Sequence, residues 1–229
     1  LPQSLTTIAG EGSSTGAFSA NKNLSVVVIP DNVTTIVGGA FAGCTSLKTI
    51  VFGANVTTLG AGMLRGCTSL TEVSLPKKLT IIPNSCFLGC PALSKVILPE
   101  GLTTIEGYAF QDCSSLQTIQ LPSTIRVMTQ AFAGCTGLVE IEIPEGVSIL
   151  DKTFMDCPNL SKVTLPSSLT TIGTQAFGGC SNLVSLHIPS GVTNIGNSAF
   201  YGCIALSNIV LPSGLTTLGD YAFQDCRAL

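Results

Sequence analysis

The chain has 229 residues, of which 10% are charged and 45% hydrophobic, and its 10 Lys and Arg against 13 Asp and Glu give a net charge of −3. This balance leaves no basic stripe for nucleic acid and no polybasic patch for a membrane surface, and the hydrophobic content is too high for a disordered chain. Gly, Pro, Ser and Thr interrupt every apolar run well before the roughly 18 residues of a membrane span. The sequence therefore indicates a folded chain that neither binds nucleic acid nor inserts into a membrane.

The first element, residues 1–23, is an incomplete structural unit. Leu1–Ile8 matches the later segment Leu165–Ile172, but extra residues near 9–15 separate it from the Ala17-Phe18 pair that should follow. The chain starts with Leu rather than Met, and Leu1–Ile8 lacks the charged start and long apolar stretch of a signal peptide. We expect an insertion near 9–15, in a chain that has been processed or excised from a longer one.

From residue 24 onward, one unit of 22 or 23 residues repeats along the chain. Nine of the ten cysteines recur at this period, and each is followed three residues later by a leucine. These cysteines are Cys44, Cys67, Cys90, Cys113, Cys135, Cys157, Cys180, Cys203 and Cys226. Self-similarity at a fixed period of this size marks a repeat architecture, so we assign nine full repeats to residues 24–228 of a single domain, 1–229. Leu229 would begin a further strand, and no polar cap follows it. We therefore expect the chain to be a segment of a longer array.

Each unit begins with a short strand, for which Leu93–Pro99 serves as the example. Val96 and Leu98 point to one side of this segment, and Lys95 and Ile97 point to the other. Alternation of this kind is typical of a strand with one buried face. Counted from Lys95, the second and fourth residues are therefore predicted to enter the core, and the first and third residues to face outward.

The remainder of the unit is predicted to turn and to return. Pro99-Glu100-Gly101 has the composition of a type I turn, and Leu102–Ile105 is rich in β-branched residues that favour a second short strand. Tyr108–Cys113 is too short and too polar on one side for a regular helix. We expect a single 3₁₀ or helical turn there.

A single unit buries too few apolar side chains to offset the conformational entropy that is lost when it is ordered, so the units must stack. Stacking in register places nine phenylalanines in one ladder, with Leu64 in its only gap: Phe18, Phe41, Phe87, Phe110, Phe132, Phe154, Phe177, Phe200 and Phe223. We therefore predict a β-rich solenoid that forms a right-handed superhelix. A parallel sheet of at least eight in-register strands should line its concave face, with short 3₁₀ or extended segments on the convex side.

The repeated motif is C-x-x-L-x-x-[IV]-x-L-P followed by L-T-x-I-G-x-x-A-F-x-G-C, as in Cys157–Pro166 and Leu169–Cys180. It resembles the leucine-rich repeat, specifically the BspA-like type of bacterial and protist surface proteins. The asparagine ladder of the common leucine-rich repeat is missing, and the cysteine ladder precedes the leucine instead. The resemblance implies a secreted or surface-anchored module for adhesion or host interaction. Its partner would be a protein or a glycan, including components of a host extracellular matrix, and it would lie at the cell surface or outside the cell.

Three interpretations of the ten cysteines are open: disulfides, a metal site and buried thiols. No C-x-x-C occurs, and His187 is the only histidine, which disfavours zinc. Cysteines of adjacent parallel units can come within disulfide range. However, Asn21 fills the same slot in the first unit, and a thiol suits a small buried slot. We favour buried, reduced thiols and expect neither a metal nor a cofactor.

No catalytic constellation emerges from the remaining chemistry. A Ser-His or Cys-His nucleophile system would have to use His187, which occupies an outward strand position. Glu140 and Glu142 lie two residues apart on one strand face, loosely like a glycosidase pair, but an open sheet face offers no pocket between them. The glycine-rich stretch Gly10–Gly16 lacks the lysine of a phosphate-binding loop. We expect a protein that is not an enzyme.

The outward strand positions carry the remaining candidate functional residues, because they vary from unit to unit while the core positions do not. Varied chemistry on this face favours a binding module, whereas uniform Ser and Thr would favour a structural spacer that displays other domains. Both functions stay open. The candidate ligand-binding residues on the concave face are Val26, Val28, Val51, Thr118, Gln120, Glu140, Glu142, Lys162 and His187.

Overall fold

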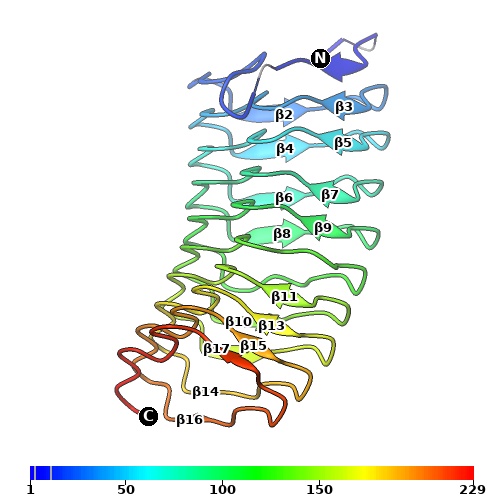
Figure 1. Cartoon of the computed structure of the whole chain (residues 1–229). Coiled ribbons are helices and arrows are strands. Elements are labelled where there is room, and N and C mark those ends of the chain that lie inside the picture. The colour runs from blue at the N-terminus through cyan, green and yellow to red at the C-terminus, as the bar shows by residue number, and fades with distance from the viewer. Residues whose placement is uncertain (3, 11) are drawn as a thin grey trace.

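The chain folds into a parallel β-solenoid of about 8 turns, as expected from its repeats. The structure, a computed structural model, describes residues 1–2, 4–10 and 12–229. Its coils lie one above another along a single axis, with the two termini at opposite ends of the stack (Figure 1). Within the described residues no helix is long and apolar enough to cross a membrane. The predicted solenoid is therefore confirmed.

Eight strands form a first column along the stack. They are β2 (Val26–Val28), β4 (Thr49–Val51), β6 (Glu72–Ser74), β8 (Lys95–Ile97), β10 (Glu140–Glu142), β12 (Lys162–Thr164), β14 (Ser185–Leu186) and β16 (Asn208–Ile209). Paired strands are parallel and in register, so that Glu72 lies opposite Lys95 and Glu140 lies opposite Lys162. The predicted register is confirmed.

The expectation of one continuous sheet of eight strands is wrong. The first column consists of four separate pairs, β2-β4, β6-β8, β10-β12 and β14-β16. Residues 116–121 of the fifth unit, which were expected to form a strand, lie in the same column without strand pairing. Strands of two or three residues share few hydrogen bonds with each neighbour, so a small rotation between coils is enough to interrupt the ladder.

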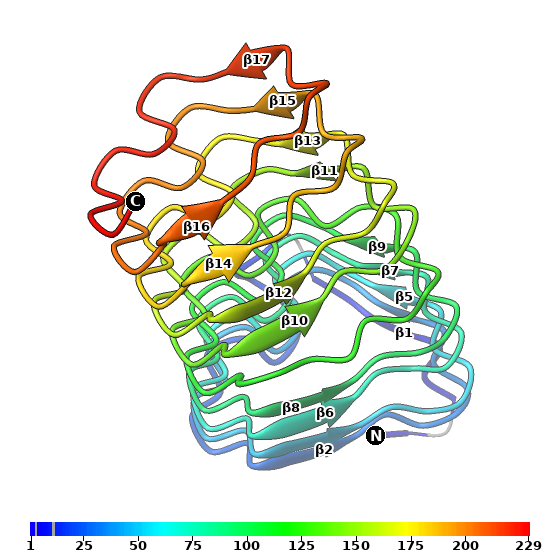
Figure 2. The same cartoon turned by 90° about the horizontal axis from the view of Figure 1, so that it is seen from below.

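A second column of strands runs along the opposite side of each coil (Figure 2). It comprises β1 (Thr7–Ile8), β3 (Thr35–Ile36), β5 (Thr58–Leu59), β7 (Ile81–Ile82), β9 (Thr104–Ile105), β11 (Ile149–Leu150), β13 (Thr171–Ile172), β15 (Asn194–Ile195) and β17 (Thr217–Leu218). These strands join into sheets of three, two and four members. The second extended segment predicted from Leu102–Ile105 is therefore confirmed by β9.

The corner that follows the second strand is built from tight turns closed by hydrogen bonds between residues three apart, and within the described residues a longer helix does not form there. In the example unit the amides of Ala109, Gln111 and Cys113 each donate to the carbonyl three residues earlier, at 3.2–3.3 Å. Tyr108 and Asp112 have φ of 59° and 60°, in the left-handed region. Left-handed residues at both ends of this segment end any helical run, because right-handed helices require negative φ.

The core is a set of columns in which each residue packs on its equivalent in the next coil. Phe18 stacks on Phe41, and an unbroken series of stacked rings runs from Phe87 to Phe223 with centroid separations of 5.1–5.9 Å. Leu64 is fully buried in the gap between the two series. The predicted phenylalanine ladder is confirmed, and its offset-stacked geometry is one that aromatic rings favour.

Short polar side chains add a second kind of link along the axis. The hydroxyls of Thr103, Thr170 and Thr216 each donate to the backbone carbonyl of the equivalent residue one coil earlier, at 2.9–3.1 Å. In the fifth unit Arg126 takes the place of this threonine, and its Nη1 donates to three carbonyls, including that of Glu145 at 3.2 Å. The Ser and Thr content of the repeat therefore serves the stack itself.

Residues 12–15 of the predicted insertion lie over the corners of the two coils that follow it. A Cβ built on Gly39 would lie 2.6 Å from the amide nitrogen of Thr15, and one built on Gly62 would overlap the carbonyl of Ser13. Both glycines also have positive φ, 64° and 63°. Glycine is required at these two positions because the insertion occupies the space that a side chain would need.

Replacing Lys152 by glycine is expected to stabilise the protein. Lys152 has a φ of 48°, at the corner position that Gly39 and Gly62 occupy in earlier units. A non-glycine residue in this region is strained, so Lys152→Gly should raise the free energy of unfolding by about 1 kcal/mol, measured by urea denaturation. Lys95→Gly, in the extended backbone of β8, is the matched control and should lower it by about 0.5–1 kcal/mol. Equal destabilisation by both changes would contradict the strain argument.

Candidate functional site

The outward surface of the first strand column is the candidate binding surface, here called the strand face. All nine predicted ligand-binding residues are exposed, and they occupy outward positions of this column. Thr118 and Gln120 belong to the unpaired fifth segment, which lies beside β10 because the Val139 amide donates to the Gln117 carbonyl at 2.9 Å. The structure thus brings the predicted residues onto one face, and their role in binding stays a prediction.

The first end of the strand face is apolar. Val26 and Val28 are 56% and 58% exposed, and Val51, opposite Val28 in the β2-β4 ladder, is 50% exposed. Beside them is a shallow hollow of about 220 Å³, lined by Leu1, Phe18, Leu24, Val26, Val27, Val28 and Phe41. Exposed valines next to a hollow are available for contact with an apolar partner.

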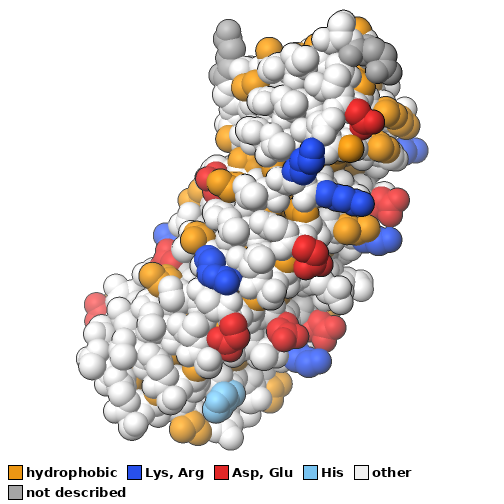
Figure 3. Space-filling view, turned by 90° about the vertical axis from the view of Figure 1, so that its right-hand side faces the viewer, with side chains coloured by type: hydrophobic (Ala, Val, Ile, Leu, Met, Phe, Trp, Pro, Cys, Tyr) orange, Lys and Arg blue, Asp and Glu red, His pale blue; other side chains and the backbone are white. Residues whose placement is uncertain are grey.

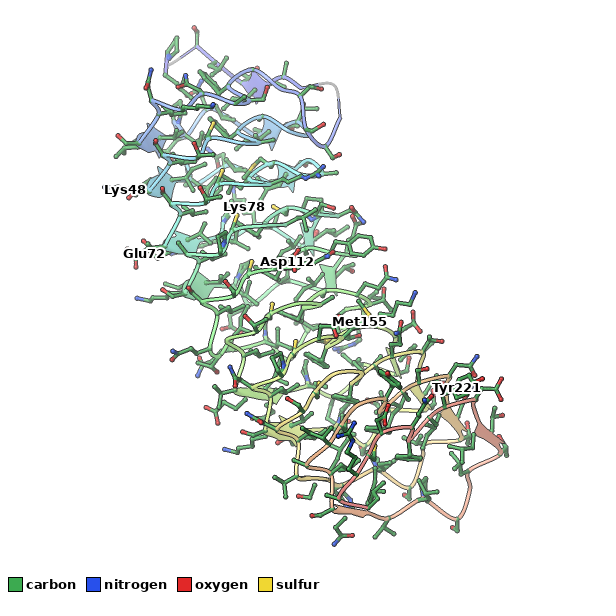
Figure 4. The ribbon with its side chains drawn as sticks, turned by 90° about the vertical axis from the view of Figure 1, so that its left-hand side faces the viewer. Lys48, Glu72, Lys78, Asp112, Met155 and Tyr221 are labelled. Atoms are coloured by element: carbon green, nitrogen blue, oxygen red, sulfur yellow. The ribbon has the colours of Figure 1, made fainter. Side chains whose placement is uncertain are left out.

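The middle of the strand face carries its charges. Lys95 Nζ lies 4.0 Å from Glu72 Oε2, and Lys162 Nζ lies 3.2 Å from Glu140 Oε2. All four side chains are exposed, so each pair contributes only about 0–1 kcal/mol to stability. Within the described residues Glu142 forms no ion pair. Figure 4 shows Glu72 projecting outward from the β6 side of the array, away from the corner that carries Tyr221.

The other end of the strand face contains His187. A shallow hollow of about 230 Å³ is lined there by Ser185, Leu186, His187, Asn208, Ile209 and Val210. Ser185 and His187 are both exposed on β14 or next to it, but among the described residues no hydrogen bond joins their side chains, and no carboxylate lines the hollow. The geometry of a Ser-His nucleophile system is not assembled at this position.

Nine outward residues of this face were left out of the predicted set, and four of them are charged or large and apolar. Ile97 is 51% exposed and Val210 is 74% exposed, and Glu72 and Lys95 form the first ion pair. The alternation of the strand already placed all four outward. Their importance depends on what lies beside them in neighbouring coils, which one unit does not reveal.

The nine cysteines of the repeat form a hydrogen-bonded ladder in the core. Each thiol donates to the backbone carbonyl of the phenylalanine-column residue in the preceding unit, as Cys113 does to Phe87 and Cys135 to Phe110, with S···O distances of 3.0–3.3 Å throughout. Cys86, the tenth, fills the slot that Ala109 occupies in the next unit. All ten thiols are free and buried, which confirms the predicted burial.

Burial also sets the acidity of these thiols. Removal from water disfavours the thiolate and raises the pKa of Cys90, Cys157 and Cys203 to about 12, from an ordinary value near 9. Protonated, buried thiols are poor nucleophiles and poor metal ligands. In the part of the chain that the structure describes, no three His, Cys, Asp or Glu side chains are grouped as metal ligands would be.

The chain matches the BspA type leucine rich repeat region, in 6 copies, over residues 13–139 and 123–229. It belongs to this family. Leucine-rich repeat solenoids of this kind are non-catalytic repeat scaffolds, and proteins of the BspA type are typically surface-associated. The resemblance found in the motif of Cys157–Cys180 is therefore confirmed.

Solved structures of bacterial leucine-rich repeat proteins share the fold. A leucine-rich repeat protein from Bacteroides ovatus is 29% identical over 100% of this chain and 70% of its own, with a TM-score of 0.75. A leucine-rich repeat protein from T. pallidum is 28% identical over 80% of this chain and 78% of its own, with a TM-score of 0.58. A leucine-rich cell surface protein from Faecalibacterium prausnitzii is 24% identical over 98% of this chain and 82% of its own, with a TM-score of 0.51. Among curated proteins no match was found.

The thiols are expected to be reduced, free of metal and unreactive in the native state. A thiol reagent added to the folded protein at pH 8 should modify few groups, because each sulfur is buried and protonated. In denaturant the same reagent should modify about ten, the number of cysteines in the sequence. Several disulfides between neighbouring units, detected as missing thiols in the denatured sample, would refute this expectation.

The raised thiol pKa values predict a specific loss of stability at alkaline pH. The folded state retains protons that unfolded thiols release near pH 8.5. The contribution of each buried thiol to the free energy of unfolding is therefore complete below about pH 8.5. It declines as the pH approaches 12, by about 1.4 kcal/mol per pH unit for each thiol. Cys86→Ala removes one such group, whose pKa is raised by burial, and installs the residue used by Ala109. Between pH 9.5 and 11 the free energy of unfolding of Cys86→Ala should therefore fall less steeply than that of wild type, by about 1.4 kcal/mol per pH unit.

The control for this pH dependence is Ser85→Ala, which changes the neighbouring residue without removing a titrating group. It should leave the alkaline slope of wild type unchanged. All other titrating groups are shared by the three proteins, so their contribution cancels in the comparison. Identical slopes for Cys86→Ala and wild type would contradict the assignment.

Proposed function

We propose that the chain is a non-catalytic ligand-binding module of a cell-surface or extracellular protein, and that it binds a protein or a glycan with its strand face. The array of nine repeats, residues 24–228, with the partial unit 1–23 at its first end, is the recognition unit. Membership of a typically surface-associated family supports the location. The extended, continuously exposed side of a solenoid supports the mode of binding.

One observation carries this proposal: the strand face changes its chemistry from coil to coil, whereas the phenylalanine, leucine and cysteine columns of the core repeat with few exceptions. The face passes from exposed valines at Val26, Val28 and Val51, through the Glu140–Lys162 ion pair, to His187. A residue that only satisfies strand propensity has no reason to differ between equivalent coils. Shallow hollows at both ends of the face add places where a ligand side chain or sugar can lie.

The alternative function is a structural spacer that displays other domains. The axial hydrogen bonds of Thr103 and its equivalents favour it, because they show that much of the polar composition serves the stack. The two functions differ in what the strand face does. A spacer would bind no ligand there, and its outward residues would be replaceable without effect.

The proposal is tested with Gln120→Ala/Glu142→Ala/Lys162→Ala against a panel of extracellular-matrix proteins and a glycan array. For any ligand that wild type binds, the variant should lose at least about tenfold in affinity, since it truncates three exposed polar contacts. Its thermal stability should stay close to that of wild type because surface substitutions change stability little.

The matched control is Gln224→Ala/Glu100→Ala/Lys77→Ala, which truncates the same three exposed residue types away from the strand face. It should bind as wild type does. Full affinity in the strand-face variant would move the binding surface elsewhere, and the corner around Tyr108 and Tyr221 would be the next candidate. Failure of wild type to bind any member of the panel would favour the spacer.

A further inference from the structure

The outward residues of the strand face form a pattern that becomes visible when the nine coils are numbered along the axis. The first outward position of each coil holds, in order, Val26, Thr49, Glu72, Lys95, Thr118, Glu140, Lys162, Ser185 and Asn208. The third position holds Val28, Val51, Ser74, Ile97, Gln120, Glu142, Thr164, His187 and Val210. Coil five, with Thr118 and Gln120, is the middle of the series.

Reversing the order of the coils places opposite charges face to face. In the reversed series Glu72 of coil three meets Lys162 of coil seven, and Lys95 of coil four meets Glu140 of coil six. Each charged residue in the first position thus faces its opposite. A two-fold rotation that keeps the coil order reverses the strand direction instead, so that first positions meet third positions. Glu140 would then meet Glu142, and like charges directly opposite one another are destabilising.

Most of the uncharged positions match in the same reversed order, whereas Val26 would meet Asn208 and Val51 would meet His187. Val28 of coil one meets Val210 of coil nine, and these are exposed by 58% and 74%. Ser74 meets Thr164, and Gln120 meets Gln120 of the other copy, where two amides can exchange hydrogen bonds. Ile97 opposite Glu142 is the one unfavourable match in the middle five coils.

We propose that the strand face binds the strand face of a second copy of this chain, through a two-fold axis that runs along the strand direction at coil five. This inference names the partner and rests on the proposed function, in which the strand face is the recognition surface. Rotation about that axis reverses the order of coils and keeps first positions opposite first positions. A two-fold interface of this kind presents the same patch from both copies.

Charges across the whole array agree with the reversed arrangement. In Figure 3, Lys and Arg side chains gather in the upper part of the view and Asp and Glu side chains in the lower part. The sequence has six Lys and Arg in residues 1–100 and four in residues 101–229, against four and nine Asp and Glu. Two copies in reversed order bring the more basic end of one toward the more acidic end of the other, which favours their encounter.

The size of the face indicates a weak and reversible contact. Nine coils at about 4.8 Å make a strip of roughly 40 Å, and three strand residues make it about 10 Å wide. About 400 Å² per copy is half of the roughly 800 Å² that each partner contributes to a stable complex. Self-association should therefore need high local concentration, as when many copies are held on one surface, and should weaken with salt.

The axis position is tested by cross-linking through an added cysteine. Gln120→Cys lies next to the axis, so its thiol meets the same thiol of the second copy. In the matched control Thr164→Cys the cysteine replaces another exposed residue of the face, but it faces Ser74 in the reversed arrangement. Under a mild oxidant at equal concentration, Gln120→Cys should form disulfide-linked dimers at least roughly tenfold faster. Equal rates for the two variants would overturn the proposal, since the ten native thiols are buried and do not contribute.

Charge exchange supplies the second arm of the test, in the Gln120→Cys protein. Glu72→Lys/Lys95→Glu inverts one intrachain ion pair and keeps it intact, and Glu140→Lys/Lys162→Glu does the same for the other. Either double variant alone places like charges across the axis and should cross-link slowly. An equal mixture of the two double variants should cross-link about half as fast as the Gln120→Cys parent at the same total concentration, because half of the encounters join unlike variants, which face each other with opposite charges. The quadruple variant should cross-link as fast as the parent.

The outcomes separate this inference from the proposed function. If both double variants cross-link as fast as the parent, or if their mixture stays slow, pairing in reversed order is excluded. If self-association fails while Gln120→Ala/Glu142→Ala/Lys162→Ala still loses a ligand from the panel, binding by the strand face stands and only the second copy is excluded as its partner. Light scattering at increasing protein concentration provides an independent readout of the dimer.

Discussion

Apart from residues 12–15 of the insertion, each coil of this protein contacts only the coils before and after it. Every residue must therefore be compatible with its own equivalent as a neighbour. Phenylalanine satisfies this condition by offset stacking, as Phe87 does on Phe110. The cysteine thiol satisfies it by donating to a carbonyl one coil away, and the threonine hydroxyl does the same on the surface. A column in which every residue carries the same charge cannot satisfy this condition, because equivalent residues lie about 4.8 Å apart and would repel one another. The low content of charged residues follows from this constraint.

Most of the fold could be predicted because the constraint is visible in the sequence. A residue type that recurs at a fixed interval must stack on itself, which gives the phenylalanine ladder, the gap filled by Leu64 and the burial of the cysteines. The alternation of Lys95 to Leu98 gave the inward and outward sides of the first strand. These inferences need only the period and the strand repeat of two.

What could not be predicted depends on geometry within or between coils. The left-handed conformation at Tyr108 is a property of the corner, and nothing about tyrosine indicates it. The division of the first column into pairs depends on small rotations between coils, and so do the hollows at the two ends of the strand face. The thiol donors were missed for another reason: a cysteine regarded as a small apolar residue conceals its hydrogen bond, whose acceptor is a backbone carbonyl without a sequence signature.

The strand face is where the stacking constraint leaves a choice. Adjacent coils there need opposite charges, and Glu72–Lys95 and Glu140–Lys162 meet that need. The need would be met equally well if the second pair ran from lysine to glutamate. In that order, however, the reversed series would place glutamate opposite glutamate and lysine opposite lysine. Since both pairs run from glutamate to lysine, the order in the second pair is not explained by stability within one copy. Complementarity between two copies does account for it, which is why inverting a single pair tests recognition while leaving the stack intact.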